Sequence, residues 1–527
     1  MTLAELASGP PLDLVVIGGG INGCAIAEGA AARGLRVALF EAADFGFGTT
    51  WRSTKLIHGG LRYLEHGDVR LVFESLRERR WLLKTRPYLV TPQRFLLPML
   101  PWTRRPAWQM KVGLATYDLL ALYRGVPTHR RLSRAKLQAK APYLSGDANG
   151  GFSFFDARVH SPERLALEFA LSAQRLGAAV YNHAAVTGIH ANSGQVEAVS
   201  VRHEGAEFIV PARHVVNAAG PWVDAVNKLG DLPGTELLGV TRGTHIVVEL
   251  DNPPGHDAIF STAKSDGRVF FAVPQGELLL IGTTDERYDG HPSDIRPVPS
   301  DIDYLLAEAQ ELMPGRAIRR EHIRYAYAGL RPLQKVEGGP EAAISRRHAV
   351  IDHGKLGGAE GVFSTVGGKL STFHPLAEEV ATLAGAGRTR ARVDQQVAPG
   401  WRETLLDSGL PKPSLRHLRI YGADIGQVLS LGKEALCEHA GAIEGEVRYV
   451  VRNELAVTLA DVMMRRTGIS WAACRGLCAI SRAAAIAAEE AGWDAAETER
   501  QVSAFREELD YHLPTEELIV AEPDQHR

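Results

Sequence analysis

The stretch Asp13-Leu-Val-Val-Ile-Gly-Gly-Gly-Ile-Asn-Gly23 decides the fold, because an apolar strand runs directly into a glycine-rich turn. Gly18, Gly20 and Gly23 match the spacing G-x-G-x-x-G, in which the first glycine permits a tight turn, the second admits a pyrophosphate and the third lets a helix pack on the strand. The helix that follows, about residues 21–33, directs its N-terminal N–H groups at that phosphate. Glu41 ends the next strand, 36–40, where a ribose hydroxyl needs an acceptor. This unit predicts a dinucleotide site.

The composition fits a globular protein of two or three domains, with 527 residues, 45% of them apolar and 23% charged. Four cysteines are too few and too scattered for a disulfide framework, which favours a reducing compartment. Cys474 and Cys478 are one helical turn apart, but no second ligand pair accompanies them. We therefore expect buried small residues here and no metal site; Cys24 is likewise interpreted as a packing residue.

The charge is unevenly distributed although the net charge is only −3. Residues 51–135 hold 17 Lys and Arg against 5 Asp and Glu, whereas residues 401–527 hold 14 against 21. A basic N-terminal third predicts an anionic partner, which is a phosphorylated substrate, a lipid surface or both. Nucleic acid is not expected, because no recognisable binding module contains the basic residues. Neither a signal peptide nor an apolar run long enough to span a bilayer is visible.

Residues 94–124 combine basic residues and tryptophans with an apolar helix, and two interpretations stay open. Trp102, Trp108, Arg104, Arg105 and Lys111 are typical of an element that lies on a bilayer surface. Alternatively, the segment is a surface excursion packed on the protein's own core.

The remaining pattern predicts an α/β protein. A helix over 164–178 leads into the strand 179–181, and further strands are expected at 184–189, 196–202 and 207–210. Residues 214–222 and 361–370 are each expected to form a strand that ends in a glycine turn. Strand signals at 244–250, 268–273 and 277–282 predict an antiparallel sheet with hairpins. After a break near residues 388–400, residues 413–508 are almost wholly helical in pattern. We therefore predict a first unit over 11–385 with interleaved segments and a helical cap over 398–520.

Several motifs together carry a family resemblance. They are Val-Ile-Gly-Gly-Gly-Ile-Asn-Gly (16–23), Lys-Leu-Ile-His-Gly-Gly-Leu-Arg-Tyr-Leu-Glu (55–65), Asn-Ala-Ala-Gly-Pro-Trp (217–222), Gly-Thr-His (243–245), Ile-Gly-Thr-Thr-Asp (281–285), Gly-Leu-Arg-Pro-Leu (329–333), Gly-Gly-Lys-Leu-Ser-Thr (367–372) and, in the cap, 446–454 and 461–467. Over nearly its whole length the chain resembles the FAD-dependent, membrane-associated glycerol-3-phosphate dehydrogenases. These belong to the D-amino-acid-oxidase-like group, so the resemblance implies a Rossmann-like FAD-binding domain, an interleaved antiparallel substrate domain and a C-terminal helical cap.

The resemblance implies oxidation of sn-glycerol 3-phosphate to dihydroxyacetone phosphate. A hydride would pass from C2 to the flavin N5, and the electrons would go to a membrane quinone. It also implies a cytoplasmic protein held peripherally at the cytoplasmic membrane; a homodimer is left open. The nearest alternative is an oxidase that gives hydrogen peroxide. An amine oxidase of the same superfamily is disfavoured by the many cations, and a flavin-binding adaptor without turnover is disfavoured by the intact site residues.

Phosphate recognition calls for guanidinium and ammonium groups, and Arg62, Arg331, Arg346 and Lys369 are available. By match to the family, Arg62, Arg331 and Lys369 contact substrate, Arg346 lies nearby, and Arg331 and Lys369 are also expected to be catalytic. Tyr63 can reach over the substrate from the same segment as Arg62. Loss of the hydroxyl proton needs a base with a near-neutral pKa, for which His58 and His245 are the two candidates.

The predicted FAD contacts come from four parts of the sequence. They are Gly18, Gly20, Ile21, Asn22, Gly23 and Glu41; Thr50, Ser53, Lys55, Leu56, His58 and Gly59; Val186, Ala218 and Gly220; and Gly368, Lys369 and Leu370. With Gly367, the last group matches the family turn that stabilises the reduced flavin at its N1–C2 carbonyl edge. The chain departs from the family at two places: Thr49-Thr50-Trp51 replaces Thr-Ser-Ser, and Phe373-His374 replaces Tyr-Arg.

Overall fold

The computed structural model describes residues 1–61, 64, 68–233, 236–252, 255–335, 347–387 and 400–520, without the side chains of residues 518 and 520. Its first layer is a six-stranded sheet in the order β18-β19-β11-β1-β2-β7, in which β18 is antiparallel to β19 and the other pairs are parallel. The strands are β1 (Leu14–Ile17), β2 (Val37–Phe40), β7 (Ala179–Tyr181), β11 (Val215–Asn217), β18 (Ala349–Asp352) and β19 (Val362–Val366).

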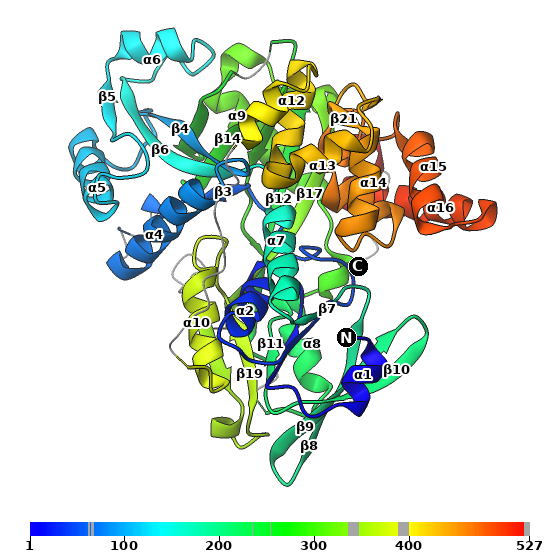
Figure 1. The fold of residues 1–527 in the computed structure, drawn as a ribbon. Coiled ribbons are helices and arrows are strands. Elements are labelled where there is room, and N and C mark those ends of the chain that lie inside the picture. The colour runs from blue at the N-terminus through cyan, green and yellow to red at the C-terminus, as the bar shows by residue number, and fades with distance from the viewer. Residues whose placement is uncertain are drawn as a thin grey trace.

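Both faces of this sheet are covered, which explains why β1 and β2 at its centre are continuously apolar. Leu14 and Val16 pack with α2 (Ile21–Ala31), α7 (Pro162–Arg175) and α10 (Phe373–Leu383). Val15 and Ile17 point to the opposite face, onto a three-stranded sheet of β8 (Ala185–Asn192), β9 (Gln195–His203) and β10 (Ala206–Pro211). Figure 1 shows the helices and the small sheet on either side of β11 and β19. This assembly, called the nucleotide module below, confirms the predicted Rossmann-like domain.

The second layer is a larger, mainly antiparallel sheet in the order β16-β12-β15-β14-β13-β4-β6-β3, with β17 paired to β12 and β5 to β6. Its strands are β3 (Leu56–Ile57), β4 (Val90–Pro98), β5 (Arg130–Leu132), β6 (Gly151–Val159), β12 (Leu238–Glu249), β13 (Ala258–Thr262), β14 (Val269–Gln275), β15 (Leu278–Gly282), β16 (Glu286–Arg287) and β17 (Ile323–Gln334). Ile246 and Val248 face α9 (Pro299–Leu312), whereas Val247 joins the core shared with the nucleotide module. Alternation along β12 therefore directs His245 to that shared side.

Further helices complete the first unit. They are α1 (Leu3–Ser8), α4 (Val69–Thr85), α5 (Ala107–Leu120), α6 (Arg134–Lys140) and α8 (Val223–Lys228). Figure 1 shows α4, α5 and α6 together at the edge formed by β5 and β6, away from the cap.

The cap is mainly helical, as predicted. Its helices are α11 (Trp401–Leu406), α12 (Lys412–Leu418), α13 (Ile425–Ser430), α14 (Glu444–Asn453), α15 (Ile480–Ala491), α16 (Ala495–His512) and α17 (Glu516–Val520). The helical pattern did not predict the hairpin of β20 (Ala435–Cys437) and β21 (Ala442–Ile443). The prediction that Cys474 and Cys478 are buried is wrong, because they lie in a loop before α15, where Cys474 is partly exposed and Cys478 is exposed.

A buried ionic cluster joins the cap to the nucleotide module. Asp44, just after β2, is fully buried and accepts hydrogen bonds from Arg465 Nε at 2.9 Å and from Arg466 Nη1 and Nη2 at 2.6 and 2.7 Å. On α7, Arg164 forms a two-pronged ion pair with Glu454 of the cap, at 3.0 and 2.6 Å. Charges removed from water are tolerated only when they are paired in this way, so both pairs fix the position of the cap.

Candidate functional site

The glycine turn after β1 has the geometry that the sequence predicts. At Gly18, where φ is +104°, an added Cβ would lie 2.7 Å from the Ala218 carbonyl oxygen, and at Gly23 it would lie 1.9 Å from the Gly18 oxygen. At Gly20 the nearest atom would be Thr50 Oγ1, at an ordinary 3.4 Å. The first and third glycines are therefore required by the protein's own packing. The second has open space in front of its backbone, as a pyrophosphate requires.

Glu41 and Thr50 contact this turn directly. Glu41 is partly buried, and its carboxylate accepts from the N–H groups of Gly19 at 2.5 Å and of Ala43 at 2.8 Å. Burial raises the pKa of Glu41, although these two hydrogen bonds oppose the shift. Thr50 Oγ1 accepts from the N–H of Ile21 at 3.1 Å, which places the loop 49–54 over the start of α2.

A second glycine turn, after β19, meets the start of α2 from the other side. Gly367 and Gly368 have φ values of +72° and +86°, and Asn22 Nδ2 donates to the Gly367 carbonyl at 3.4 Å. Asn22 Oδ1 is buried without a hydrogen-bond partner in the described structure. Lys369 and Leu370 follow this turn and are partly exposed. The two glycine turns thus meet at Asn22, whose Oδ1 has no partner among the described residues. Such a site can hold the polar edge of a cofactor.

Ala218 and Gly220 follow β11, so they share the carboxyl edge of the parallel sheet with both glycine turns. The Ala218 N–H donates to the Ile17 carbonyl at 2.8 Å, and Gly220 has φ +56°. Val186 lies on β8 of the three-stranded sheet and packs partly exposed against the apolar cluster on that side. Ligands of open α/β sheets bind at this carboxyl edge, so the residues present fit FAD.

His245 and Arg331 lie on one face of the large sheet, and the Arg331 guanidinium lies over Gly243, two residues from His245. In the antiparallel register, His245 is opposite Tyr327 and Thr241 is opposite Arg331, so these side chains share one face. Glycines make the room: an added Cβ at Gly243 would lie 2.4 Å from Arg331 Nη2, and one at Gly282 would lie 2.4 Å from His245 Cδ2. Arg331 is braced by Asp285 Oδ1 at 2.9 Å and Thr283 Oγ1 at 3.0 Å.

The His245 ring stacks on Tyr327, with centroids 4.9 Å apart, and its Nε2 is 3.0 Å from Thr54 Oγ1. Its Nδ1 is buried without a hydrogen-bond partner among the described residues. Burial, together with the charges of Arg331 and Lys55, lowers the pKa of His245 to about 3. The imidazole is therefore neutral at physiological pH, and its pKa in the free protein is well below the near-neutral value that the sequence analysis expects of the base.

His58, the other candidate base, follows β3 and lies with its ring centroid 6.4 Å from that of Phe271. The next residue, Gly59, donates its N–H to the Tyr117 hydroxyl at 2.7 Å. Tyr117 in turn donates to Asp156 at 2.8 Å, and Asp156 pairs with Arg79 at 2.5 Å. This buried chain fixes the backbone beside His58.

Ser53, Lys55 and Leu56, three predicted FAD contacts, have different surroundings in the structure. Ser53 Oγ donates to the Thr50 carbonyl at 3.3 Å and accepts from the Lys55 N–H at 3.3 Å, so it shapes the loop. The Lys55 ammonium lies 3.4 Å from the ring centroid of Trp471 in the cap, and burial lowers its pKa to about 8. Leu56 is buried in the core. Lys55 thus points to the junction with the cap.

The two departures from the family pattern have clear structural roles. Trp51 is buried at the cap junction, 5.4 Å from the Trp471 ring and 5.9 Å from the His512 ring. His374 Nδ1 lies 2.7 Å from Glu78 Oε1 on α4, and its ring packs edge-on against Trp81. Arg62, Tyr63 and Arg346, all predicted substrate contacts, lie outside the described residues.

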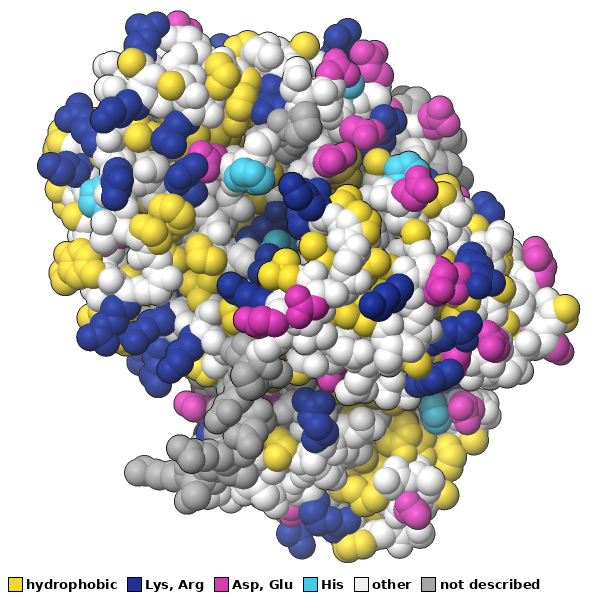
Figure 2. Space-filling model, turned by 45° about the horizontal axis from the view of Figure 1, so that its top comes forward, with side chains coloured by type: hydrophobic (Ala, Val, Ile, Leu, Met, Phe, Trp, Pro, Cys, Tyr) yellow, Lys and Arg dark blue, Asp and Glu magenta, His cyan; other side chains and the backbone are white. Residues whose placement is uncertain are grey.

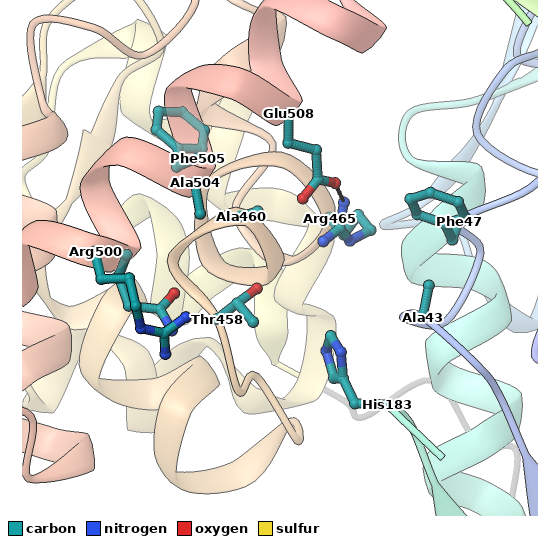
Figure 3. Close-up of a pocket in the computed structure, with 11 residues that line it drawn as sticks. Ala43, Phe47, His183, Thr458, Ala460, Arg465, Arg500, Ala504, Phe505 and Glu508 are labelled. Atoms are coloured by element: carbon teal, nitrogen blue, oxygen red, sulfur yellow. Dashed lines mark hydrogen bonds and ion pairs between the residues drawn. The ribbon is translucent and has the colours of Figure 1, made fainter. Parts of the chain in front are cut away.

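Sequence reasoning missed the residues that support the site. Thr54, Asp285 and Tyr327 hold His245 and Arg331 in place; Thr54 and Asp285 belong to polar segments that the sequence singles out, but neither was predicted to have this role, and Tyr327 was in no motif. The signal for Tyr327 was its position two residues before the Gly-Leu-Arg motif on a strand. A pocket with a volume of about 140 Å³ lies elsewhere, between Ala43, Phe47 and His183 of the nucleotide module and the cap side chains Arg465, Arg500 and Glu508 (Figure 3). It is lined by none of the predicted site residues that the structure describes.

Comparison with known proteins gives consistent matches. Residues 13–381 match the family described as FAD dependent oxidoreductase, and residues 354–498 match the C-terminal domain of alpha-glycerophosphate oxidase. A glycerol-3-phosphate dehydrogenase of Synechocystis sp. is 35% identical over 536 residues, covering 94% of this chain and 96% of that protein. A D-erythritol 1-phosphate dehydrogenase of Brucella abortus is 35% identical over 481 residues, covering 86% and 94%.

The fold agrees with solved structures. The X-ray structure of glycerol-3-phosphate dehydrogenase from Bacillus halodurans, complexed with FAD, superposes with a TM-score of 0.73 at 26% identity and covers 97% of both chains. An L-alpha-glycerophosphate oxidase from Mycoplasma pneumoniae with FAD bound has a TM-score of 0.57 at 16% identity, which shows a shared fold.

The glycine turn makes a paired prediction. Gly23→Ala should lower the free energy of unfolding by about 3 kcal/mol, because its Cβ meets backbone. Gly20→Ala should change it by less than about 1 kcal/mol yet weaken FAD binding. Thermal unfolding and the flavin-to-protein absorbance ratio measure the two effects. Normal flavin content in Gly20→Ala would show that the cofactor does not approach this backbone.

Proposed function

We propose, from the premise that this chain belongs to the FAD-dependent oxidoreductase family and to its glycerol-3-phosphate dehydrogenases, that it oxidises sn-glycerol 3-phosphate to dihydroxyacetone phosphate. The observation that carries the proposal is the pair of His245 and Arg331 on one face of the large sheet, with a neutral imidazole beside a fixed guanidinium. The guanidinium of Arg331 would bind the phosphate dianion through paired hydrogen bonds, and the imidazole of His245 would accept the proton of the C2 hydroxyl. Figure 2 shows a hollow near the centre of one face that contains Lys or Arg and His side chains.

The bound FAD would accept the hydride from C2 at its N5. The glycine turns after β1 and β19, with Asn22 and Ala218, would hold it along the carboxyl edge of the parallel sheet. Arg331 and Lys369 would bind the phosphate and orient C2. Lys369 follows the turn after β19 and would reach the site from there, so the substrate would be held from both layers of the fold.

Substrate binding also tunes the base. In the free protein, Arg331 and Lys55 both disfavour a charged His245. A phosphate dianion beside Arg331 offsets that repulsion, so the proton affinity of His245 rises when substrate is present. His58 is the second candidate for the base, because the Gly59 backbone holds it at the edge of the same sheet.

Substrate identity is tested by adding compounds anaerobically to the holoenzyme. We expect sn-glycerol 3-phosphate to bleach the flavin and glycerol to leave it oxidised. D-erythritol 1-phosphate is the second candidate substrate, because a relative of equal identity is named for it. The ratio of the two kcat/KM values decides between them. A flavin that none of these esters reduces would refute the proposed reaction.

Arg331→Met should raise KM for the phosphoester about 10- to 150-fold, because each charge-assisted hydrogen bond contributes about 1.5–3 kcal/mol. Arg324→Met is the matched control, since Arg324 lies on the same strand but pairs with Glu249 at the surface. Equal effects of the two substitutions would remove Arg331 from the binding site.

His245→Asn should slow flavin reduction about 10²- to 10⁴-fold at neutral pH with little change in substrate affinity. Because the pKa of His245 is about 3 in the free protein, replacing it should leave the shape of the kcat/KM profile unchanged between about pH 5 and 8. Stopped-flow reduction of His245→Asn and His58→Asn compares the two candidates. A large loss in His58→Asn alone would assign the base to His58.

We further propose that the electrons pass to a membrane quinone and that α5 lies on the bilayer. No helix among the described residues is both long and apolar enough to span a membrane. On α5 and just after it, Trp108 is 65% exposed, Val112 58%, Leu119 56%, Leu122 53% and Tyr123 61%. Single exposed apolar residues are common, but five on one short segment support an interfacial surface.

Basic residues flank this apolar surface. Arg104, Arg105, Lys111 and Arg124 are exposed around α5. On the side where Figure 1 places α4, α5 and α6, Figure 2 shows Lys and Arg side chains beside hydrophobic ones. Trp102, in contrast, packs partly buried and donates to the Thr262 carbonyl at 3.1 Å, so only the later part of 94–124 is available to lipid.

Val112→Asp should lower the fraction of protein bound to anionic vesicles by about tenfold or more. The substitution removes apolar area that would be buried in the bilayer and adds repulsion between the new carboxylate and the anionic lipids. Ile209→Asp is the control, since Ile209 is 59% exposed on β10 of the three-stranded sheet. Equal co-sedimentation of both variants would refute the α5 surface. In the same preparation, stoichiometric peroxide with no reduction of a quinone analogue would favour the oxidase alternative.

A further inference from the structure

Four metal-ligating side chains meet at one place in the cap. The ligand atoms of Cys437, His439, Cys474 and Cys478 all lie within 4.8 Å of one another. Three of the chain's four cysteines are therefore gathered with a histidine, from two segments that are far apart in sequence. The site is outside every residue used in the proposed reaction.

Each segment presents its ligands from a tight turn. Cys437 ends β20, and the turn to β21 is closed by the Gly441 N–H, which donates to the Cys437 carbonyl at 2.8 Å. The Ala440 N–H donates to Cys437 Sγ at 3.3 Å, the kind of contact that a thiolate accepts. Cys474 and Cys478 flank a turn in which Arg475 and Gly476 have φ values of +53° and +79°.

The distances match a single tetrahedral ion. The three Sγ–Sγ distances are 3.6, 3.3 and 3.4 Å, and Cys478 Sγ is 3.7 Å from His439 Nδ1. A tetrahedron with metal–sulfur bonds of about 2.3 Å has sulfur–sulfur edges of about 3.8 Å. A disulfide would need sulfurs at about 2.05 Å. The four groups are thus arranged around a common centre rather than paired.

The chemistry and the access are also suitable. Three soft thiolates and one imidazole in a tetrahedron favour zinc, and four protein ligands close the coordination shell. Cys437 is buried, whereas His439 and Cys478 are exposed, so an ion can enter from solvent.

A second cluster of potential ligands serves as a contrast. Asp44, His183 and Asp461 also converge, but guanidinium groups already occupy that cluster. Arg465 and Arg466 donate to Asp44, and Arg465 Nη2 donates to Asp461 at 2.7 Å. The cation there is arginine. Among the ion pairs of the described residues, none places a guanidinium or ammonium group against the three sulfurs around Cys437.

We propose that Cys437, His439, Cys474 and Cys478 bind one zinc ion. The ion clamps the β20–β21 hairpin to the loop before α15 and has a structural role in the cap. This assignment replaces the prediction that the cap contains no metal site.

Elemental analysis of the full-length flavoprotein tests the site. We expect about one zinc per chain, and about a tenfold loss in Cys478→Ser. Cys24→Ser is the matched control, because this buried cysteine lies in the nucleotide module and should leave zinc content unchanged. His439→Cys keeps four ligands and should also retain zinc.

Wild-type protein alone gives a second measurement that does not depend on variants. Cobalt exchanged into the site should give the intense visible bands of a tetrahedral thiolate complex, and a strong chelator should lower the temperature at which the cap unfolds. Three outcomes would overturn the proposal: a zinc-free protein that rejects cobalt, full zinc in Cys478→Ser, or iron at one per chain without zinc.

Discussion

The carboxylate of Asp44, held in a dry interior by two arginines of the cap, is the constraint on which the assembled molecule depends. Removing one partner from such a cluster leaves an uncompensated charge and costs about 3–5 kcal/mol. Asp44 follows Glu41 by three residues, so the strand end that carries the predicted ribose acceptor also anchors the cap. Trp51 and Lys55, packed on Trp471, continue this junction along the loop that leads to His58. The position of the cap and the shape of the nucleotide site are therefore not independent.

The parts of the fold that could be predicted are those with local signals. Leu14–Ile17 and Val37–Phe40 are continuous apolar runs with a glycine turn between them, and parallel strands buried on both faces have this pattern. Other elements have no such signal. β17 mixes arginine, proline and tyrosine, so its pairing with β12 follows from the register of a long sheet rather than from alternation. The β20–β21 hairpin is too short for a periodic pattern to reveal it.

Some residues of the candidate site could likewise be predicted from local sequence, whereas others could not. Gly18 and Gly23 were predictable, because a turn that brings backbone against backbone tolerates no Cβ, and Gly368 has a φ of +86° that favours glycine. The proximity of His245 to Arg331 was not, since it depends on which residues of β12 and β17 face each other. The direction of Lys55 and the meeting of Cys437 with Cys474 depend on how the cap is placed, and contacts over such sequence separations leave no mark on a single sequence.

Through Tyr117, α5 also supports the backbone beside His58. The helix that exposes Trp108 and Val112 to the outside buries Tyr117, whose hydroxyl accepts from the backbone beside His58 and donates to Asp156. If α5 lies on a bilayer as proposed, a tilt of the helix would move Tyr117 and with it the backbone at Gly59, beside His58. Docking on the bilayer would then change the geometry next to His58, and turnover would be faster on a lipid surface than in free solution.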